Sequence, residues 1–238
     1  MKMELHVHTQ YSHDSLLDKY LMLLMCKLKK IECIAITDHN TTLGGRAFKG
    51  FLEAHGIKVI IGEEIFTADG EIIGLFLQKD IKAGLSASET VKLIREQGGL
   101  VYLPHPYDKK RYKTVLKDSA RETIKNDIDL VEFHNGRNIS SEFTKKQTVI
   151  ANTLDAIRVV GSDAHTFFEL GRNYNVIDSF SDKESFLKCL LDNDYVLNKC
   201  CFGAHITTKF VRLWKMIVGG NLHGIYRVIN KRIRNLQQ

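Results

Sequence analysis

The chain has 238 residues, of which 44% are hydrophobic and 26% charged, with 17 glycines, 2 prolines and a formal net charge of +6. These values exclude a collagen-like or low-complexity chain and extensive disorder, and the length suits one α/β barrel. No apolar run approaches the roughly 18 residues of a transmembrane helix, and no signal-peptide core follows Met1, so we expect a cytoplasmic protein.

Seven short segments rich in apolar and β-branched residues are predicted strands. They span residues 3–7, 32–37, 58–62, 71–77, 100–104, 129–133 and 157–161. Helical patterns lie between most of them, at 15–30 and from Ser86, whose capping box with Glu89 predicts a helix start. The alternation predicts a parallel sheet closed by helices, whereas the third and fourth strands, joined by a turn at 67–70, predict a local hairpin.

Residues 195–238 differ from the rest of the chain in charge. They carry eight Lys or Arg and no Asp or Glu, which leaves 26 basic and 28 acidic residues in 1–194. After a predicted helix at 182–193, amphipathic patterns predict helices at 207–218 and 224–234. We expect these helices to pack across the barrel with a solvated basic end. Contact of the basic tail with a membrane surface or with nucleic acid is the alternative.

Histidines and carboxylates follow the predicted strands. They are His6, His8, Asp14, Asp38, His39, Glu63, Glu64, Glu71, His105, Asp163 and His165. Because the carboxyl ends of parallel barrel strands open on one face, we expect these side chains to converge. Burying so many polar groups together is costly unless metal ions compensate. The five cysteines contain no Cys-x-x-Cys pair, so the pattern predicts imidazole and carboxylate ligands for Mn²⁺, Fe²⁺ or Zn²⁺ and no disulfide framework.

Five motifs, taken in this order, resemble the polymerase and histidinol phosphatase (PHP) superfamily. They are His6-Val7-His8-Thr9 with Ser12 and Asp14, Thr37-Asp38-His39, Gly62-Glu63-Glu64, His105-Pro106 and Gly161-Ser162-Asp163-Ala164-His165. The resemblance implies a distorted seven-stranded (β/α)7 TIM-like barrel, which we expect over residues 1–194, before a basic helical extension at 195–238. It also implies up to three divalent metal ions and the hydrolysis of phosphate esters.

The resemblance also implies which residues hold each ion. The first would take His6, His8, Glu64 and Asp163; the second Asp14, His39 and His165; the third would share Glu64 and use His105. Glu71 stands where many members carry a further histidine, which makes the third site more anionic and favours Mn²⁺ or Fe²⁺ over Zn²⁺. Glu64, Asp163 and His165 are the expected catalytic residues of a di- or trinuclear site that uses a metal-bridging hydroxide.

Further polar residues are candidate substrate contacts. We expect Arg137, His134 and His13 to contact substrate, and additional phosphate contacts could come from the loop cations Lys109, Lys110 and Arg111. Asp38, next to the expected ligand His39, is predicted to orient a neighbouring ligand.

The leading expectation is a phosphomonoesterase acting on a phosphorylated small molecule or nucleotide. One alternative is a 3′,5′-nucleotide phosphatase or 5′–3′ exonuclease acting on nucleic-acid ends, which the basic tail favours and the negative charge of 1–194 disfavours. A non-catalytic barrel and a metal-dependent C–N hydrolase are further alternatives. Every core ligand position carries a residue able to bind metal, which disfavours the non-catalytic barrel. No lysine matches the carboxylated lysine that such C–N hydrolases usually use, which disfavours the C–N hydrolase. A tail beside the metal site would support polymer substrates.

Overall fold

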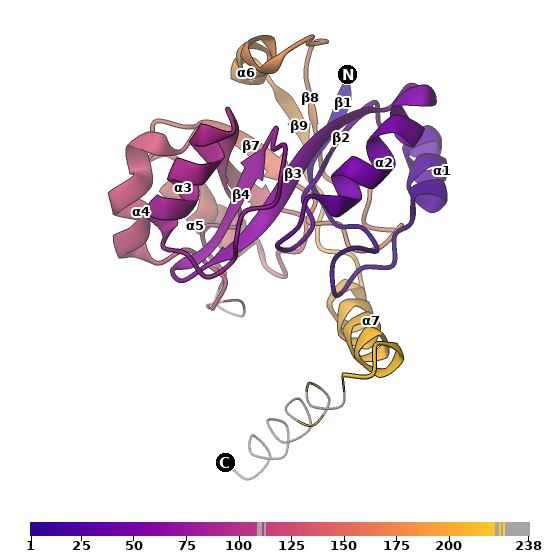
Figure 1. The fold of residues 1–238 in the computed structure, drawn as a ribbon. Coiled ribbons are helices and arrows are strands. Elements are labelled where there is room, and N and C mark those ends of the chain that lie inside the picture. Colours follow the sequence, from indigo (N-terminus) through magenta and orange to yellow (C-terminus); the bar gives the residue numbers. More distant parts are fainter. Residues whose placement is uncertain (109–110, 112, 222–223, 225, 227–238) are drawn as a thin grey trace.

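The structure, a computed structural model, describes residues 1–108, 111, 113–221, 224 and 226 (Figure 1). Its elements in chain order are β1 (Lys2–Val7), α1 (Lys19–Lys29), β2 (Cys33–Ile36), α2 (Leu43–Ala54), β3 (Lys58–Thr67), β4 (Gly70–Leu75), α3 (Ala87–Glu96), β5 (Leu100–Leu103), α4 (Asp118–Ile124), η1 (Lys125–Asp127), β6 (Leu130–Asn135), α5 (Ser141–Ala151), β7 (Ile157–Gly161), β8 (Tyr174–Val176), α6 (Lys183–Leu191), β9 (Asp194–Val196) and α7 (Ala204–Val218).

The described strands form one sheet in the order β7-β6-β5-β4-β3-β2-β1-β8-β9, which curves into a nearly closed barrel. Strand β2 pairs in parallel with β1 and β3, and β6 pairs in parallel with β5 and β7. Strand β4 is antiparallel to both of its neighbours, β3 and β5. A parallel bridge from Val7 to Ala164 brings the segment after β7 against the end of β1. The predicted α/β barrel and the predicted hairpin at β3–β4 are therefore confirmed.

The strand count differs from the prediction, because the described sheet has nine strands rather than seven. The seven predicted segments correspond to β1–β7, and β8 and β9 add an antiparallel pair next to β1. Each of these two strands spans three residues, too few to establish the alternation that predicts a strand, and β9 is largely exposed. β9 crosses the expected boundary at residue 194, and the division into 1–194 and 195–238 remains a prediction.

Local capping residues determine where the helices begin. The Asp18 side chain accepts hydrogen bonds from the backbone of Tyr20 and Leu21, so α1 begins at Lys19 rather than at residue 15. The capping box of Ser86 and Glu89 is present at the start of α3, as predicted. Helices α1 to α5 flank the outer side of the sheet and leave the carboxyl ends of the parallel strands open to the loops that carry the site (Figure 1).

The C-terminal helix α7 begins after Gly203, whose φ of 80° lies in the left-handed region, and projects from the barrel (Figure 1). It corresponds to the predicted helix at 207–218. The predicted helix at 224–234 lies outside the described residues apart from Gly224 and Tyr226. None of the described helices combines the length and apolar character needed to cross a bilayer.

Candidate metal centre

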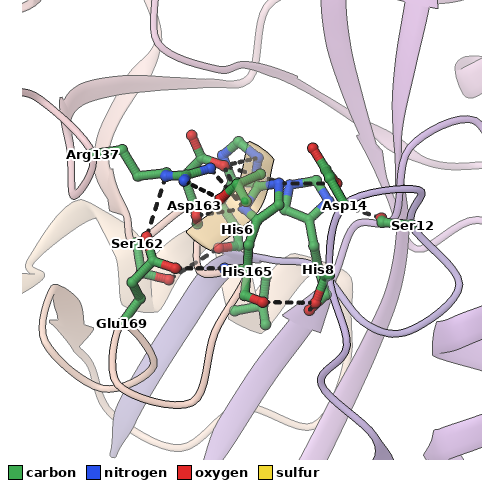
Figure 2. A network of polar contacts seen from close by, with 12 residues as sticks. His6, His8, Ser12, Asp14, Arg137, Ser162, Asp163, His165 and Glu169 are labelled. Carbon is green, nitrogen blue, oxygen red and sulfur yellow. Dashed lines mark hydrogen bonds and ion pairs between the residues drawn. The ribbon is translucent and has the colours of Figure 1, made fainter. Parts of the chain in front are cut away.

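The nine predicted metal ligands meet at one end of the barrel, where the parallel strands have their carboxyl ends and the antiparallel β4 begins. Figure 2 labels His6, His8, Asp14, Asp163 and His165. His6 lies on β1 with His8 and Asp14 after it, His39 follows β2, Glu64 and Glu71 lie on β3 and β4, His105 follows β5, and Asp163 and His165 follow β7. All nine are buried except His39, which is partly exposed. Loops that are distant in the sequence therefore supply one cluster.

The first expected ligand set surrounds a common space. His6 Nε2 lies 3.4 Å from Glu64 Oε1 and 3.8 Å from Asp163 Oδ1. His8 Nε2 lies 3.4 Å from Glu64 Oε2 and 3.5 Å from Asp163 Oδ1. The two imidazoles share a face because side chains alternate along an extended segment, so residues two apart point the same way.

The second expected set lies beside the first. Asp14 Oδ1 is 3.7 Å from His39 Nε2 and 3.3 Å from His165 Nε2. The ring of His8 lies next to both imidazoles, with centroid distances of 4.4 Å to His39 and 4.0 Å to His165. The imidazole rings of the first and second sets therefore pack against each other.

Glu71 lies beside the other residues of the third expected set. His105 Nε2 lies 3.1 Å from Glu64 Oε1 and 3.3 Å from Glu71 Oε2. His39 Nδ1 lies 3.0 Å from Glu64 Oε2 and 4.0 Å from Glu71 Oε1. Glu64 thus contacts members of both the first and the third set.

The donor atoms fit divalent cations in their chemistry and in their spacing. His6 Nε2, His8 Nε2 and Asp14 Oδ1 are buried and have no hydrogen-bond partner among the described residues. Leaving such atoms unpaired costs about 1–3 kcal/mol each. Ligand atoms bound to one ion at about 2.1 Å lie roughly 3.0–3.4 Å apart, which is close to the separations found here.

The remaining ring nitrogens of two expected ligands are held in place. His6 Nδ1 lies 3.0 Å from Glu132 Oε1, and His8 Nδ1 lies 3.1 Å from Ser12 Oγ. Ser12 donates a hydrogen bond of 2.7 Å to Asp38 Oδ1. Asp38 therefore contacts the expected ligand His8 through Ser12, and both imidazoles are oriented with Nε2 toward the centre.

Glu132 is a buried residue of the site that the sequence analysis did not single out. Its Oε1 also accepts a hydrogen bond of 2.7 Å from the Tyr102 hydroxyl, and its Oε2 accepts one of 2.7 Å from the backbone of His105. Its side chain lies close to Gly161, where a Cβ would fall 1.6 Å from Glu132 Oε1. An acidic residue inside the apolar segment 129–133 is the signal that marks it.

Contacts between histidines and carboxylates shift the pKa values of the residues in the centre. Burial alone would lower the pKa of His6, but Glu64 and Asp163 raise it well above its ordinary value. Neighbouring carboxylates likewise outweigh burial and raise the pKa of His105 to about 9. Burial disfavours the ionised forms of Glu64 and Asp163, yet nearby cationic side chains hold the pKa of each well below its usual range. Ionised carboxylates facing imidazoles are the electrostatic surroundings that a cation requires.

Two expected ligands have left-handed backbones. The φ angle is 26° at His105 and 52° at Asp163. Such angles are sparsely populated for residues with a Cβ and persist only where the surroundings impose them. Here strain coincides with the ends of β5 and β7, where the chain turns both side chains toward the centre.

Two arginines reach the cluster from loops. Arg111 Nη1 lies 2.5 Å from Asp163 Oδ2, and its Nε lies 2.8 Å from Asp108 Oδ2. Arg137 Nη1 lies 3.2 Å from His165 Nδ1 (Figure 2). The other two loop cations named from the sequence, Lys109 and Lys110, lie outside the described residues.

The two histidines expected to contact substrate lie in different surroundings. His13 is half-exposed at the edge of the cluster, with Nε2 3.6 Å from Asp14 Oδ2. His134 has both ring nitrogens next to hydrogen-bonding partners, Thr144 Oγ1 at 2.9 Å and Asn173 Oδ1 at 3.3 Å. Their expected contacts with substrate remain predictions.

The helix α7 lies beside the centre. Arg137 Nη2 donates a hydrogen bond to Thr208 Oγ1. His205 Nε2 lies 3.0 Å from the carbonyl oxygen of Arg137. Lys215 Nζ donates hydrogen bonds of 2.6 Å to the carbonyl oxygens of Gln10 and Ser12, in the loop that carries Asp14.

Known proteins are similar to this chain in sequence and in fold. The PHP domain is matched by residues 4–171. The chain is 43% identical over 145 residues to the uncharacterized protein MJ1587 of Methanocaldococcus jannaschii, an alignment that covers 57% of this chain and 82% of that protein. It is 40% identical over 177 residues to the uncharacterized protein MJ0417 of the same organism, covering 73% of this chain and 69% of the relative.

A solved structure shows the same fold. It is a two-domain protein from Bacteroides vulgatus that contains a predicted PHP-like metal-dependent phosphoesterase. The TM-score is 0.67 at 15% sequence identity, and the superposition covers 83% of this chain. The chain spans 65% of the length of that protein.

Proposed function

Because the chain belongs to the PHP domain family, we propose that it is a metal-dependent phosphomonoesterase that holds two or three divalent cations in the ligand sets described above. Mn²⁺, Fe²⁺ and Zn²⁺ suit the imidazole and carboxylate donors. The observation that carries the proposal is the cluster of buried His6, His8 and Asp14 atoms, which find no hydrogen-bond partner in the part of the chain that the structure describes and lie close to further potential metal ligands.

The chain's own residues would position the reacting groups. When bound, the cations would lower the pKa of a coordinated water and stabilise developing charge at the phosphate. Glu64 reaches the first and third ligand sets and keeps them at a fixed separation. Arg111 and Arg137 would offer guanidinium donors to phosphate oxygens, because both already contact expected ligands.

A second candidate acts on nucleic-acid ends, as a 3′,5′-nucleotide phosphatase or a 5′–3′ exonuclease. The observation that favours it is the position of α7 beside the centre, with Lys215 bound to the loop that carries Asp14. A basic helix at this place adds positive charge next to the expected phosphate site.

The test combines metal counting with turnover. Protein purified without chelator is analysed for metals per chain and then assayed with Mn²⁺ on p-nitrophenyl phosphate, bis-p-nitrophenyl phosphate, nucleotide 3′,5′-bisphosphates and 5′-phosphorylated oligonucleotides. We expect two to three metal ions per chain and EDTA-sensitive monoester hydrolysis. A preference for nucleotide or oligonucleotide substrates would favour the second candidate. Protein that neither retains nor takes up a divalent metal would contradict both.

A matched pair of variants tests the assigned site. Glu64→Gln keeps the size of the side chain but removes a charge shared by two ligand sets, so turnover should be abolished while the fold persists. Glu184→Gln makes the same chemical change at an exposed position of α6 and should leave turnover unchanged. Full activity of Glu64→Gln would refute the assigned ligand sets.

A further inference from the structure

The outward face of α7 is a continuous apolar stripe. It consists of Ile206, Phe210, Leu213, Trp214 and Ile217 and is called the α7 stripe below. These positions recur at helical spacing and therefore share one face. Phe210 is 68% exposed and Ile217 is 59% exposed. Packing against the barrel uses the opposite face, where Ala204 and Val211 are buried, so the described chain leaves the stripe to solvent.

The inner face of α7 is fixed at the metal centre. Thr208 accepts a hydrogen bond from Arg137, and Lys215 donates to two carbonyl groups of the loop after β1. Figure 1 shows α7 projecting from the barrel body. A helix anchored in this way holds its apolar stripe outward at the same end of the barrel as the centre.

The charge around the stripe is of one sign. Lys209 and Arg212 are exposed next to it, and residues 195–238 contain eight Lys or Arg and no Asp or Glu. Aromatic and aliphatic residues on one face with cations beside them are typical of helices that lie in the interface of an anionic membrane. The negative surface potential of such a membrane attracts basic segments of this kind.

Other occupants fit these residues less well. A second copy of the chain would bring together two regions of unopposed positive charge. Nucleic acid would match the cations, but aliphatic side chains such as Ile206 and Ile217 offer neither charge nor a stacking surface. With 15 residues, α7 is too short to cross a bilayer, so an in-plane position is the one that its length allows.

We propose that α7 lies in the headgroup region of an anionic bilayer and presents the metal centre to a phosphate ester carried by a lipid. The membrane contact stands on the stripe and its charge alone, whereas the lipid substrate rests on the proposed function. The two parts can therefore fail separately.

The membrane contact is tested through Trp214, which is the single tryptophan of the chain and half-exposed on the stripe. Full-length protein is mixed with vesicles of phosphatidylcholine alone or with added phosphatidylglycerol. We expect sedimentation with the anionic vesicles, a blue shift of Trp214 emission, and weakening of both by salt. Phe210→Glu should reduce the bound fraction about tenfold or more, because it places a charge on the apolar face.

A matched control separates the stripe from general exposure. Leu28 on α1 is 67% exposed, so Leu28→Glu makes the same kind of change elsewhere and should leave vesicle binding intact. Absence of binding to anionic vesicles would overturn the proposal. So would a blue shift without vesicles that grows with protein concentration, which would assign the stripe to a second copy. Oligonucleotide binding without vesicle binding would assign it to nucleic acid.

The lipid substrate is tested with phosphatidic acid in the anionic vesicles and p-nitrophenyl phosphate in solution. In Phe210→Glu, the ratio of vesicle-borne to soluble turnover should fall about tenfold. An unchanged ratio would overturn the lipid substrate. Vesicle binding without hydrolysis of either ester would leave the membrane contact standing and contradict the proposed function.

Discussion

Glu132 connects two expected ligands at the residue scale. Its carboxylate lies 3.0 Å from His6 Nδ1. It also accepts hydrogen bonds from the Tyr102 hydroxyl and from the backbone N–H of His105. Glu132→Gln preserves size but replaces an acceptor oxygen by a donor, so His6 loses its oriented partner. We expect metal affinity to fall about 10- to 100-fold, as for other residues that orient metal ligands.

This change is measured by titrating chelator-treated Glu132→Gln and wild-type protein with Mn²⁺. Glu184→Gln on the exposed face of α6 serves as the control and should bind like wild type. If Glu132→Gln also bound Mn²⁺ with wild-type affinity, the orienting role of Glu132 would be wrong.

His134 makes stability depend on pH. Burial lowers its pKa below the ordinary value of 6.5, against the hydrogen bond with Asn173. The unfolded chain then binds more protons, so this contribution to stability is present above pH 6.5 and is lost as the pH falls through the folded-state pKa. Urea unfolding between about pH 7 and pH 5 should show a smaller loss of stability for His134→Gln than for wild type. Equal losses would exclude His134 as the source.

The sequence predicted residues that belong to short motifs better than those that act across the fold. The two histidines of His6-Val7-His8 share a face, and the structure brings them together as expected. Glu132 lies within a segment that has the pattern of an ordinary strand, and its role depends on contacts with His6 of β1 and Tyr102 of β5. The contact of Arg111 with Asp163 likewise joins loops 52 residues apart, which local patterns do not show.

At the scale of an element, two of the three glycines of α2 have opposite requirements. A Cβ at Gly44 would fall 1.9 Å from Asp38 Oδ2, whereas a Cβ at Gly50 would meet nothing within 4 Å. Gly50→Ala should stabilise the protein by about 0.5–1 kcal/mol, because alanine favours the helix. Gly44→Ala should destabilise it by about 1–3 kcal/mol, because overpacking outweighs helix propensity.

Chemical denaturation of both variants measures this difference, with wild type as reference. Gly44→Ala should also lower turnover in the proposed phosphate-ester hydrolysis, because Asp38 holds Ser12, which contacts His8. Gly50→Ala provides the matched control within the same helix. Equal stabilities of the two variants would show that Asp38 is not held against the first turn of α2.

Periodicity predicted strands β1–β7 and the helices α1, α3, α6 and α7, but neither α2 nor α5 was named as a helix from the sequence. The segments of β1–β7 have enough buried residues to be recognised, whereas β8 and β9 pair at the edge of the sheet with three residues each. The start of α1 was predicted too early because the apolar residues Leu16 and Leu17 precede Asp18. The cap formed by the Asp18 side chain sets the true start of the helix. Backbone capping and edge pairing depend on geometry that residue patterns show only weakly.

At the scale of the whole molecule, the expected cations would join β1, β2, β3, β4, β5 and β7 or the segments that follow them. Ligands of the folded state that are dispersed in the unfolded chain stabilise the fold by mass action. Mn²⁺ at about 100 times its Kd should therefore add about 2.7 kcal/mol for each occupied site. Thermal unfolding with and without Mn²⁺ measures the rise in Tm, which Glu64→Gln should reduce and Glu184→Gln should retain. No rise in wild type would contradict metal binding by the folded chain.

The bridge between β1 and the segment after β7 gives the order in which the site can form. The backbone of His8 donates to Ala164 at 2.9 Å, and that of Ala164 donates to His6 at 3.3 Å. Contacts between residues so distant along the chain form slowly, because a long loop must close first. During synthesis, His6 and His8 therefore cannot complete their ligand sets until Asp163 and His165 have been made. Closing the barrel then completes the first two ligand sets in the same event.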